Sequence, residues 1–293
     1  MFILFINSLF WGFFGHQTIN SQATMLLPDE LFLFFKTHIT DIQKGAIRPD
    51  QRRRLLDEEG AKHYIDVELY DSMFKQTPIY FDDALIKYSN DTLLKRGTSP
   101  WNIFMYKQML TKAFQEKDPY KVIKYAAEVG HYYADLHVPL HTTENYNGQL
   151  TNQLGIHAFW ETVLPERYYD EYSLQTHEPE YVTHFMDTLW SVMNESHDLV
   201  KVVLSEEKRI SQLLPNQSKL VLRRRGASLQ LLPTDEYALL YHEAVGEMVS
   251  HRMSLAIQRI ANLWFTCWVD AGQPDLMELP YQPPKRKKKH KGI

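Results

Sequence analysis

The stretch that decides the fold runs from residue 131 to residue 161 and reads HYYADLHVPLHTTENYNGQLTNQLGIHAFWE. His131 and Asp135 are four residues apart, so a helix would place them on one face, one turn apart. His157 and Glu161 repeat this spacing on what is predicted to be a second helix. Imidazoles and carboxylates without a thiolate are typical of a zinc site that performs chemistry.

A histidine between the two pairs bears on this interpretation. His141 follows Pro139 and Leu140, where proline should end the first helix. One histidine–carboxylate pair at this spacing is more often a hydrogen bond on a helix surface than a metal site. Two such pairs joined by a third histidine make a metal site as plausible as hydrogen bonds on a helix surface. His137 is excluded, because it would project from nearly the opposite side of the helix.

Composition limits the class of protein. The 293 residues are 44% hydrophobic and 13% aromatic, which excludes global disorder and allows one large domain or two small ones. The formal net charge is −4, but six basic residues lie in the C-terminal tail, and the other 26 against 36 acidic residues give the body a charge of −10. An acidic body argues against tight nucleic-acid binding by phosphate neutralisation. An enzyme that touches a few phosphates through metal remains compatible.

The chain lacks the sequence motifs of several classes of enzyme. The sequence has no internal repeat, no glycine-rich phosphate loop and no nucleophile elbow. Cys267 is the one cysteine, so an intrachain disulfide is excluded, and its apolar neighbours indicate a small core residue.

Hydrophobic periodicity predicts an all-α single domain, a multi-helix bundle with the metal candidates on facing helices. Asp118-Pro119 should start the helix that carries His131, and Thr234 should cap a long helix that reaches Trp264. We expect one helix over residues 79–97, a loop around Asp50, a short hairpin over 218–233, and a loop over 142–155 that forms one wall of the site. Residues 52–59 alternate basic and acidic runs, which predicts a solvated face.

The two ends differ from the rest of the chain. Residues 1–10, MFILFINSLF, are too short to span a bilayer and resemble the core of a secretory signal, although the basic start and a small-residue cleavage site are missing. We interpret residues 1–10 as an atypical signal segment, 11–280 as the folded domain and 281–293 as a basic disordered tail. The tail could touch anionic surfaces, and a buried N-terminal strand or helix is the alternative for residues 1–10.

The ordered motifs resemble those of the trinuclear zinc phosphodiesterases, which join bacterial zinc-dependent phospholipase C to the single-strand-specific zinc nucleases. The resemblance covers roughly residues 11–165. Its motifs are Trp11-Gly-Phe-Phe-Gly-His16, Asp50, His63-Tyr-Ile-Asp66, His131-x3-Asp135-x3-Pro-Leu-His141 and His157-x3-Glu161. It implies the multi-helix phospholipase C/nuclease-like fold.

The resemblance also implies a cofactor of three zinc ions. The first would be held by Asp50, His63, His131 and Asp135, and the second by His141, His157 and Glu161. The third would take the α-amino nitrogen and carbonyl oxygen of Trp11, with His16 and a shared oxygen of Asp135. A water shared by two ions would then supply the nucleophile.

Further roles follow from the same resemblance. Asp50, Arg53 and Asp135 would be the catalytic residues, with Arg53 stabilising charge on the phosphate. Tyr64 and Asp66 would bind substrate, with the Tyr64 ring packed against a base or head group. The implied partners are nucleic acid, a nucleotide or a phospholipid, and no stable protein partner is implied.

Departures from the pattern leave the substrate open. The Trp11-to-His16 spacing and Arg53 match the nucleases, whereas Glu161 matches the phospholipases, and the nucleases' disulfides are absent. Residues 170–235 follow neither type. We therefore expect a nuclease acting on single-stranded nucleic acid or 3′-nucleotides. The alternatives are a phospholipase C and a metal-binding protein without catalysis. Binding of the Trp11 amine needs cleavage after Phe10, which predicts a periplasmic or secreted protein.

Overall fold

The computed structural model describes residues 11–53, 55–70, 77–225 and 228–282, and most of this chain is helical. The α-helices are α1 (Gly12–Met25), α2 (Asp29–Thr37), α3 (Ile39–Gly45), α4 (Arg48–Arg53), α5 (Phe81–Tyr88), α6 (Asn90–Arg96), α7 (Ser99–Gln115), α8 (Pro119–Asp135), α9 (Ile156–Ala158), α10 (Leu164–Tyr168), α11 (Phe185–Leu213) and α12 (Asp235–Asp270). Short 3₁₀ turns are η1 (Asp57–Lys62), η2 (Val67–Leu69), η3 (Pro139–Thr142), η5 (Tyr169–Glu171) and η6 (Asn216–Ser218), and η4 (Phe159–Val163) is a π-helical turn. The expected all-α fold is confirmed.

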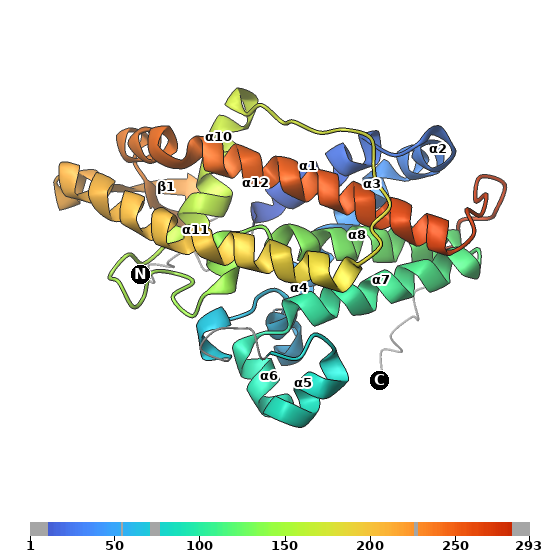
Figure 1. Ribbon diagram of the computed structural model, residues 1–293. Helices are drawn as coiled ribbons and strands as arrows, with labels where there is room; N and C mark the ends of the chain where they lie inside the picture. Colours follow the sequence, from blue (N-terminus) through green and yellow to red (C-terminus); the bar gives the residue numbers. More distant parts are fainter. Residues whose placement is uncertain (1–10, 54, 71–76, 226–227, 283–293) are drawn as a thin grey trace, which may run out of the picture.

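Helix α8 lies at the centre of the molecule. It packs against α1, α3, α7 and α12, and every residue from Ala126 to Asp135 is buried. Its start is fixed as expected, because the Asp118 side chain accepts a hydrogen bond from the Lys121 amide at 3.0 Å and Pro119 follows. Figure 1 shows α11 and α12 running side by side along the molecule, over α7 and α8. His131 and Asp135 are therefore carried by a buried part of the central helix.

Small residues bring α1 and α3 close to α8. A Cβ atom added to Gly45 would lie 2.5 Å from Ala127 Cβ, and one added to Gly130 would lie 2.3 Å from Asn20 Oδ1. The Asn20 side chain donates a hydrogen bond to the Ala127 carbonyl at 3.0 Å. These close approaches place the N-terminal part of the chain against the face of α8 that carries the candidate ligands.

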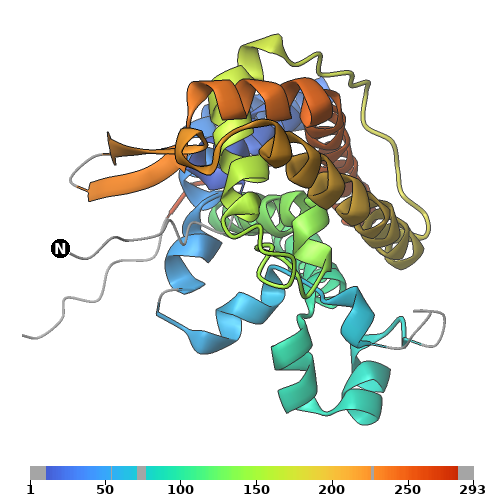
Figure 2. The same cartoon turned by 90° about the vertical axis from the view of Figure 1, so that its left-hand side faces the viewer.

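The expected single helix over residues 79–97 is wrong, because α5 and α6 are separate. The break is at Ser89, whose φ of 67° does not continue a right-handed helix. The pair projects below the bundle in Figures 1 and 2. Gly97, which follows α6, forms an isolated antiparallel bridge with Ile65.

The predicted hairpin and the predicted cap of the last helix are both present. Strands β1 (Leu220–Arg225) and β2 (Ser228–Pro233) pair antiparallel, and the Thr234 side chain accepts a hydrogen bond from the Tyr237 amide at 3.3 Å. None of the helices in the described part of the chain combines the length and apolar character of a membrane span. The signal segment and almost all of the basic tail lie outside the described residues.

Gly97→Ala tests the packing beneath the candidate substrate residue Tyr64. Gly97 has φ of +86°, and an added Cβ would lie 2.1 Å from the Tyr64 carbonyl oxygen. Gly272 has a similar φ of +81° with open space around its Cβ position, so Gly272→Ala is a matched control. We expect Gly97→Ala to lower the free energy of unfolding by about 1–3 kcal/mol more than the control does, measured by urea denaturation. Equal losses would contradict the close packing.

Candidate metal centre

Eight of the predicted ligand side chains lie together in the interior. They form three groups, and within each group one nitrogen or oxygen atom of every residue lies within 4.8 Å of those of the others. The groups are His16, His131 and Asp135; Asp50, His63 and His131; and His141, His157 and Glu161. All eight side chains are buried. Residues separated by up to 145 positions in the chain therefore converge on one polar centre.

Two of the elements that carry these ligands differ from expectation. Asp50 lies in α4, whereas a loop was expected. His157 and Glu161 lie on a helical segment, but it is α9 followed by the π-helical turn η4. Single π turns inside helices are frequent at functional sites. The two side chains still meet, with His157 Nε2 at 3.2 Å from Glu161 Oε2.

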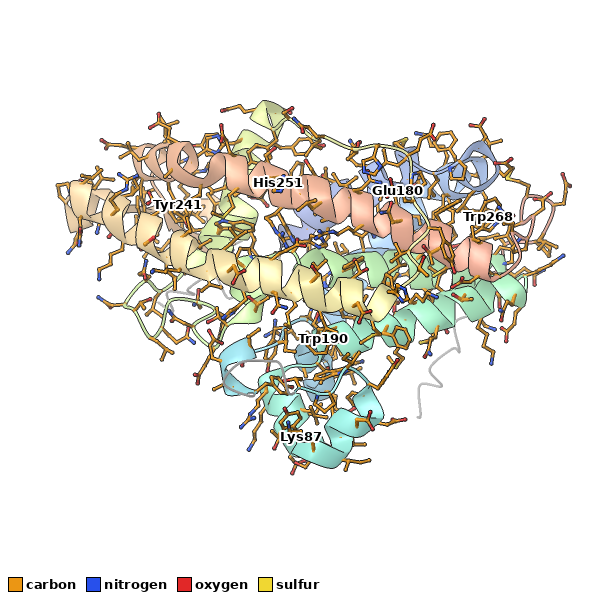
Figure 3. All side chains as sticks on the ribbon, viewed as in Figure 1. Lys87, Glu180, Trp190, Tyr241, His251 and Trp268 are labelled. Atoms are coloured by element: carbon orange, nitrogen blue, oxygen red, sulfur yellow. The ribbon has the colours of Figure 1, made fainter. Side chains whose placement is uncertain are left out.

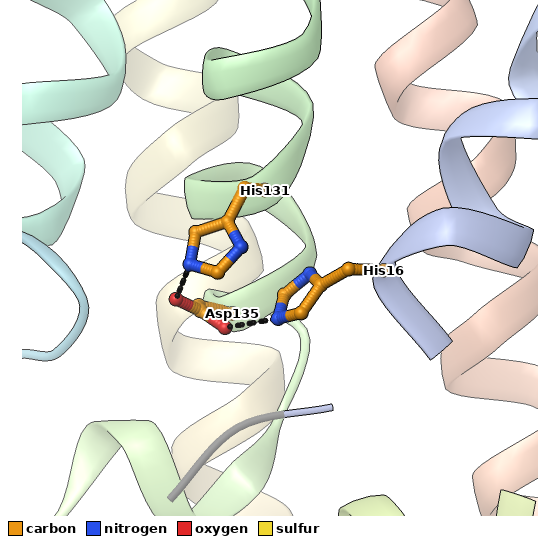
Figure 4. Close-up of side chains that lie close together, drawn as sticks. All are labelled: His16, His131 and Asp135. Atoms are coloured by element: carbon orange, nitrogen blue, oxygen red, sulfur yellow. Dashed lines mark ion pairs between the residues drawn. The ribbon is translucent and has the colours of Figure 1, made fainter. Parts of the chain in front are cut away.

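The two oxygens of Asp135 face different ligand groups. Oδ2 lies 2.9 Å from His63 Nδ1 and 3.2 Å from His131 Nε2. Oδ1 lies 3.3 Å from His16 Nε2 and 3.8 Å from His141 Nε2. Figure 4 shows His131 and His16 approaching Asp135 from α8 and α1, each toward its own oxygen. Asp135 is thus placed to connect neighbouring groups.

Backbone carbonyls fix the orientation of three of the imidazoles. His131 Nδ1 donates to the Ala46 carbonyl at 2.7 Å, His141 Nδ1 to the His63 carbonyl at 2.8 Å, and His157 Nδ1 to the Tyr146 carbonyl at 3.0 Å. A carbonyl can only accept, so each Nδ1 carries a proton and each Nε2 is the nitrogen that would bind a cation. This is the arrangement of metal-binding histidines, whose other nitrogen bonds to the protein.

The polar atoms of the centre fit a bound cation. Among the described residues, no hydrogen bond is formed by either oxygen of Asp50, by Asp135 Oδ1 or by Glu161 Oε1, and all are buried. Buried carboxylate oxygens that accept no hydrogen bond are costly unless a cation compensates them. Burial raises the pKa of Glu161 to about 8, so its carboxylate would need a proton or a metal ion at neutral pH.

Three imidazole pKa values fit the same interpretation, and that of His131 does not. Burial lowers the pKa of His63 to about 4 and that of His157 to about 3, and it also lowers the pKa of His16. These rings are neutral at physiological pH, which is the form that binds metal. Burial also acts to lower the pKa of His131, but the Asp135 and Asp50 carboxylates outweigh it and raise the pKa to about 10.

Trp11 lies at the edge of this centre. It is fully buried at the start of α1, and its indole nitrogen donates to the Ala134 carbonyl at 2.8 Å. Its ring packs against Trp160, with 5.4 Å between ring centroids. Trp11 is therefore held between the residue before Asp135 and the residue before Glu161.

The predicted substrate residues border the centre. Tyr64 is half-buried next to His63, and its hydroxyl donates to the Lys95 carbonyl at 3.1 Å. Arg53 ends α4, with its Nε close to Gly60, and its charge acts to lower the pKa of Tyr64 and that of His157. Asp66 is buried, and burial with the nearby Glu68 and Glu144 carboxylates raises its pKa to about 7.

A charged network behind the centre was not predicted from the sequence. Arg52 donates to Glu128 at 2.9 Å and to Glu59 at 3.1 Å, and Glu59 also accepts from the hydroxyl of Tyr132. Tyr132 follows His131 on α8, so the network braces that ligand. The expected solvated face over residues 52–59 is therefore wrong for Arg52 and Glu59. A run of charged residues does not indicate that one of them will pair with a buried tyrosine such as Tyr132, which lies far along the chain.

Comparisons with known proteins were made by sequence and by structure. The model of the S1/P1 nuclease family matches residues 11–266, and a search of curated proteins found no match. Clostridium perfringens alpha-toxin from an avian strain is 14% identical in sequence with a TM-score of 0.55, over 89% of this chain and 65% of the toxin. Alpha toxin from Clostridium absonum is 14% identical with a TM-score of 0.49, over 90% of this chain and 66% of the toxin. This chain thus spans just under two thirds of the length of the first toxin, and that likeness shows the fold alone.

Proposed function

Because the chain belongs to the S1/P1 nuclease family, we propose that it is a zinc-dependent hydrolase of phosphodiester bonds in single-stranded nucleic acid, or of the phosphate in 3′-nucleotides. The observation that carries the proposal is the convergence of eight buried imidazole and carboxylate side chains into three groups. A donor set of nitrogen and oxygen atoms without sulfur suits zinc in a catalytic site.

The proposed ligands are the same eight side chains, divided among the ions as the resemblance implies, with Trp11 added. Asp50, His63, His131 and Asp135 would hold one zinc ion, and His141, His157 and Glu161 a second. His16 and Asp135 would hold a third, together with the α-amino nitrogen and carbonyl oxygen of Trp11. The division of the Asp135 oxygens between His16 and His63 supports this sharing of one carboxylate. When bound, the ions would lower the pKa of a water molecule to near neutrality and neutralise phosphate charge.

The protein side chains would do the rest. The carbonyl-anchored imidazoles and the Arg52–Glu59–Tyr132 network keep the ligand atoms in place, so little reorganisation is needed when substrate binds. Arg53 would pair with a non-bridging oxygen of the phosphate as charge develops. Tyr64 would pack on the base next to the scissile bond.

Glu161 favours a second candidate function. Nucleases of the resembled superfamily usually carry aspartate at this position, and the phospholipases carry glutamate. A phospholipase C acting on a phospholipid head group is therefore the alternative. Purified protein assayed against single-stranded DNA, RNA, 3′-nucleotides and phosphatidylcholine, with and without chelator, separates the two. Chelator-sensitive hydrolysis of phosphatidylcholine alone would overturn the nuclease proposal.

Tyr64→Ala tests the proposed base contact. Stacking of one base on an aromatic ring is worth about 1–3 kcal/mol, so we expect KM for a dinucleotide to rise about 5- to 150-fold with kcat less affected. The control is Tyr181→Ala, which removes an exposed tyrosine whose hydroxyl donates to Asp270. If nucleotide kinetics do not change while phosphatidylcholine is hydrolysed strongly, Tyr64 does not bind a base.

A further inference from the structure

A cleft of about 540 Å³ lies between helix α7 and the α5–α6 pair. Its lining includes Trp101 and Asn102 from α7 and Phe81 from the start of α5, and none of the eight ligand side chains. Lys62 also lines the cleft and directly precedes His63. The Thr98 amide donates to the Ala61 carbonyl at 2.6 Å, and the Ser99 amide to the Tyr64 carbonyl at 3.1 Å. The cleft and the metal centre thus share the segment 61–64.

The aromatic part of the cleft is rigid on one side and accessible on the other. Trp101 is buried, and its indole nitrogen donates to the Ile79 carbonyl at 3.0 Å. Trp190 of α11, labelled in Figure 3, packs against it with 5.4 Å between ring centroids. Phe81 also lines the cleft; it is 40% exposed, and its ring centroid lies 6.1 Å from that of Trp101. A flat ligand in the cleft would therefore meet the exposed ring of Phe81, which packs on the buried Trp101.

Asn102 is a buried polar residue in the lining of this cleft, which combines aromatic and aliphatic side chains with polar and charged ones such as Glu58 and Asp82. Its side chain is 5% exposed, and neither Oδ1 nor Nδ2 forms a hydrogen bond within the described part of the chain. A buried carboxamide without partners costs about 1–3 kcal/mol per unsatisfied group. The fitting ligand must therefore offer a donor and an acceptor side by side, as well as apolar faces.

We propose that this cleft binds a nucleobase. Each nucleobase has flat faces for aromatic contact and, on one edge, an adjacent donor and acceptor that match a carboxamide, as asparagine matches adenine. An acyl chain would fill the apolar volume but leave Asn102 without a partner. The proposal rests on the proposed nuclease function, which says where the base comes from. The base would belong to a strand whose phosphate lies at the metal centre, or to a free nucleoside.

Nucleosides without phosphate test the proposal apart from hydrolysis. The zinc-loaded protein that begins at Trp11 is titrated with adenosine and uridine by calorimetry. In a second experiment 5-iodouridine is photocrosslinked to it and the crosslinked residues are identified by mass spectrometry. We expect crosslinks to Phe81 or Trp101. Asn102→Leu, which keeps the size of the side chain, and Phe81→Ala should each weaken binding at least about tenfold. Tyr181→Ala should have no effect, and Tyr64→Ala should leave the crosslink in the cleft.

The outcomes separate the alternatives. Unchanged nucleoside affinity in the exposed-site variant Phe81→Ala overturns the proposal even if Asn102→Leu fails to fold. Crosslinks found only at Tyr64 also overturn it. So does a ligand with a dodecyl chain that displaces 5-iodouridine and binds Asn102→Leu more tightly than the wild type. Loss of phosphodiester hydrolysis with nucleoside binding intact would instead count against the proposed function.

Discussion

Replacement of Asp135 by asparagine is expected to lower phosphodiester hydrolysis by more than about 100-fold, above the range that changes outside the ligand shell produce. The two Asp135 oxygens face different ligand groups, and asparagine keeps only one oxygen and loses the charge. Burial acts to raise the pKa of Asp135, but the neighbouring His131 and His141 outweigh it and hold that pKa well below its usual value, which favours the carboxylate form. Elemental analysis of the variant should show less zinc than the wild type.

Two further variants make the Asp135 result specific. Asp50→Asn removes a ligand that contacts only the group with His63 and His131, so it should cost less zinc and less activity than Asp135→Asn. Asp198→Asn, at an exposed position on α11, should match the wild type. The assignment of Asp135 fails if its asparagine variant folds and keeps full zinc and full activity.

Cleavage between Phe10 and Trp11 is expected to be required for full activity. The amide nitrogen of an internal Trp11 has no lone pair to give, whereas a free α-amine has a reference pKa of roughly 8 and can lose its proton to a zinc ion. The Trp11 side chain is anchored on Ala134 and Trp160, beside two predicted ligands, so its backbone nitrogen belongs to the same region. Export to the periplasm or the cell exterior would then be part of forming the site.

Two recombinant forms test this requirement, one beginning at Met1 and one at Trp11. We expect the longer form to hold one zinc ion fewer and to lose most of its activity. A form with a single glycine before Trp11 is the matched control, since it moves the amine by one residue and should resemble the longer form. The mass of the intact native protein checks the requirement. A native protein that still begins at Met1 and hydrolyses substrate at the full rate would refute it.

Local chemistry explains what the sequence predicted well. Spacing of four residues on α8 fixed the relation of His131 to Asp135, and the caps at Asp118 and Thr234 marked where long helices begin. These signals depend only on neighbours in the chain. The resemblance to a known family supplied Trp11, His16 and Asp50, which no local pattern connects to α8.

Long-range packing explains what the sequence did not predict. The break at Ser89 and the π-helical turn at Glu161 depend on how the surrounding helices close. Arg52 was expected in solvent because its carboxylate neighbours suggest a surface, but its partner Glu128 lies 76 positions away. The cleft at Asn102 left no sequence signal, because an asparagine inside an apolar helix face has the same spacing whether or not it has a partner.

The zinc content of native protein purified without chelator tests the central claim most directly. The three ligand groups predict about three zinc ions per chain by elemental analysis, with activity lost on chelation and restored by zinc. One zinc ion or none per chain, in protein that is active, would contradict the account.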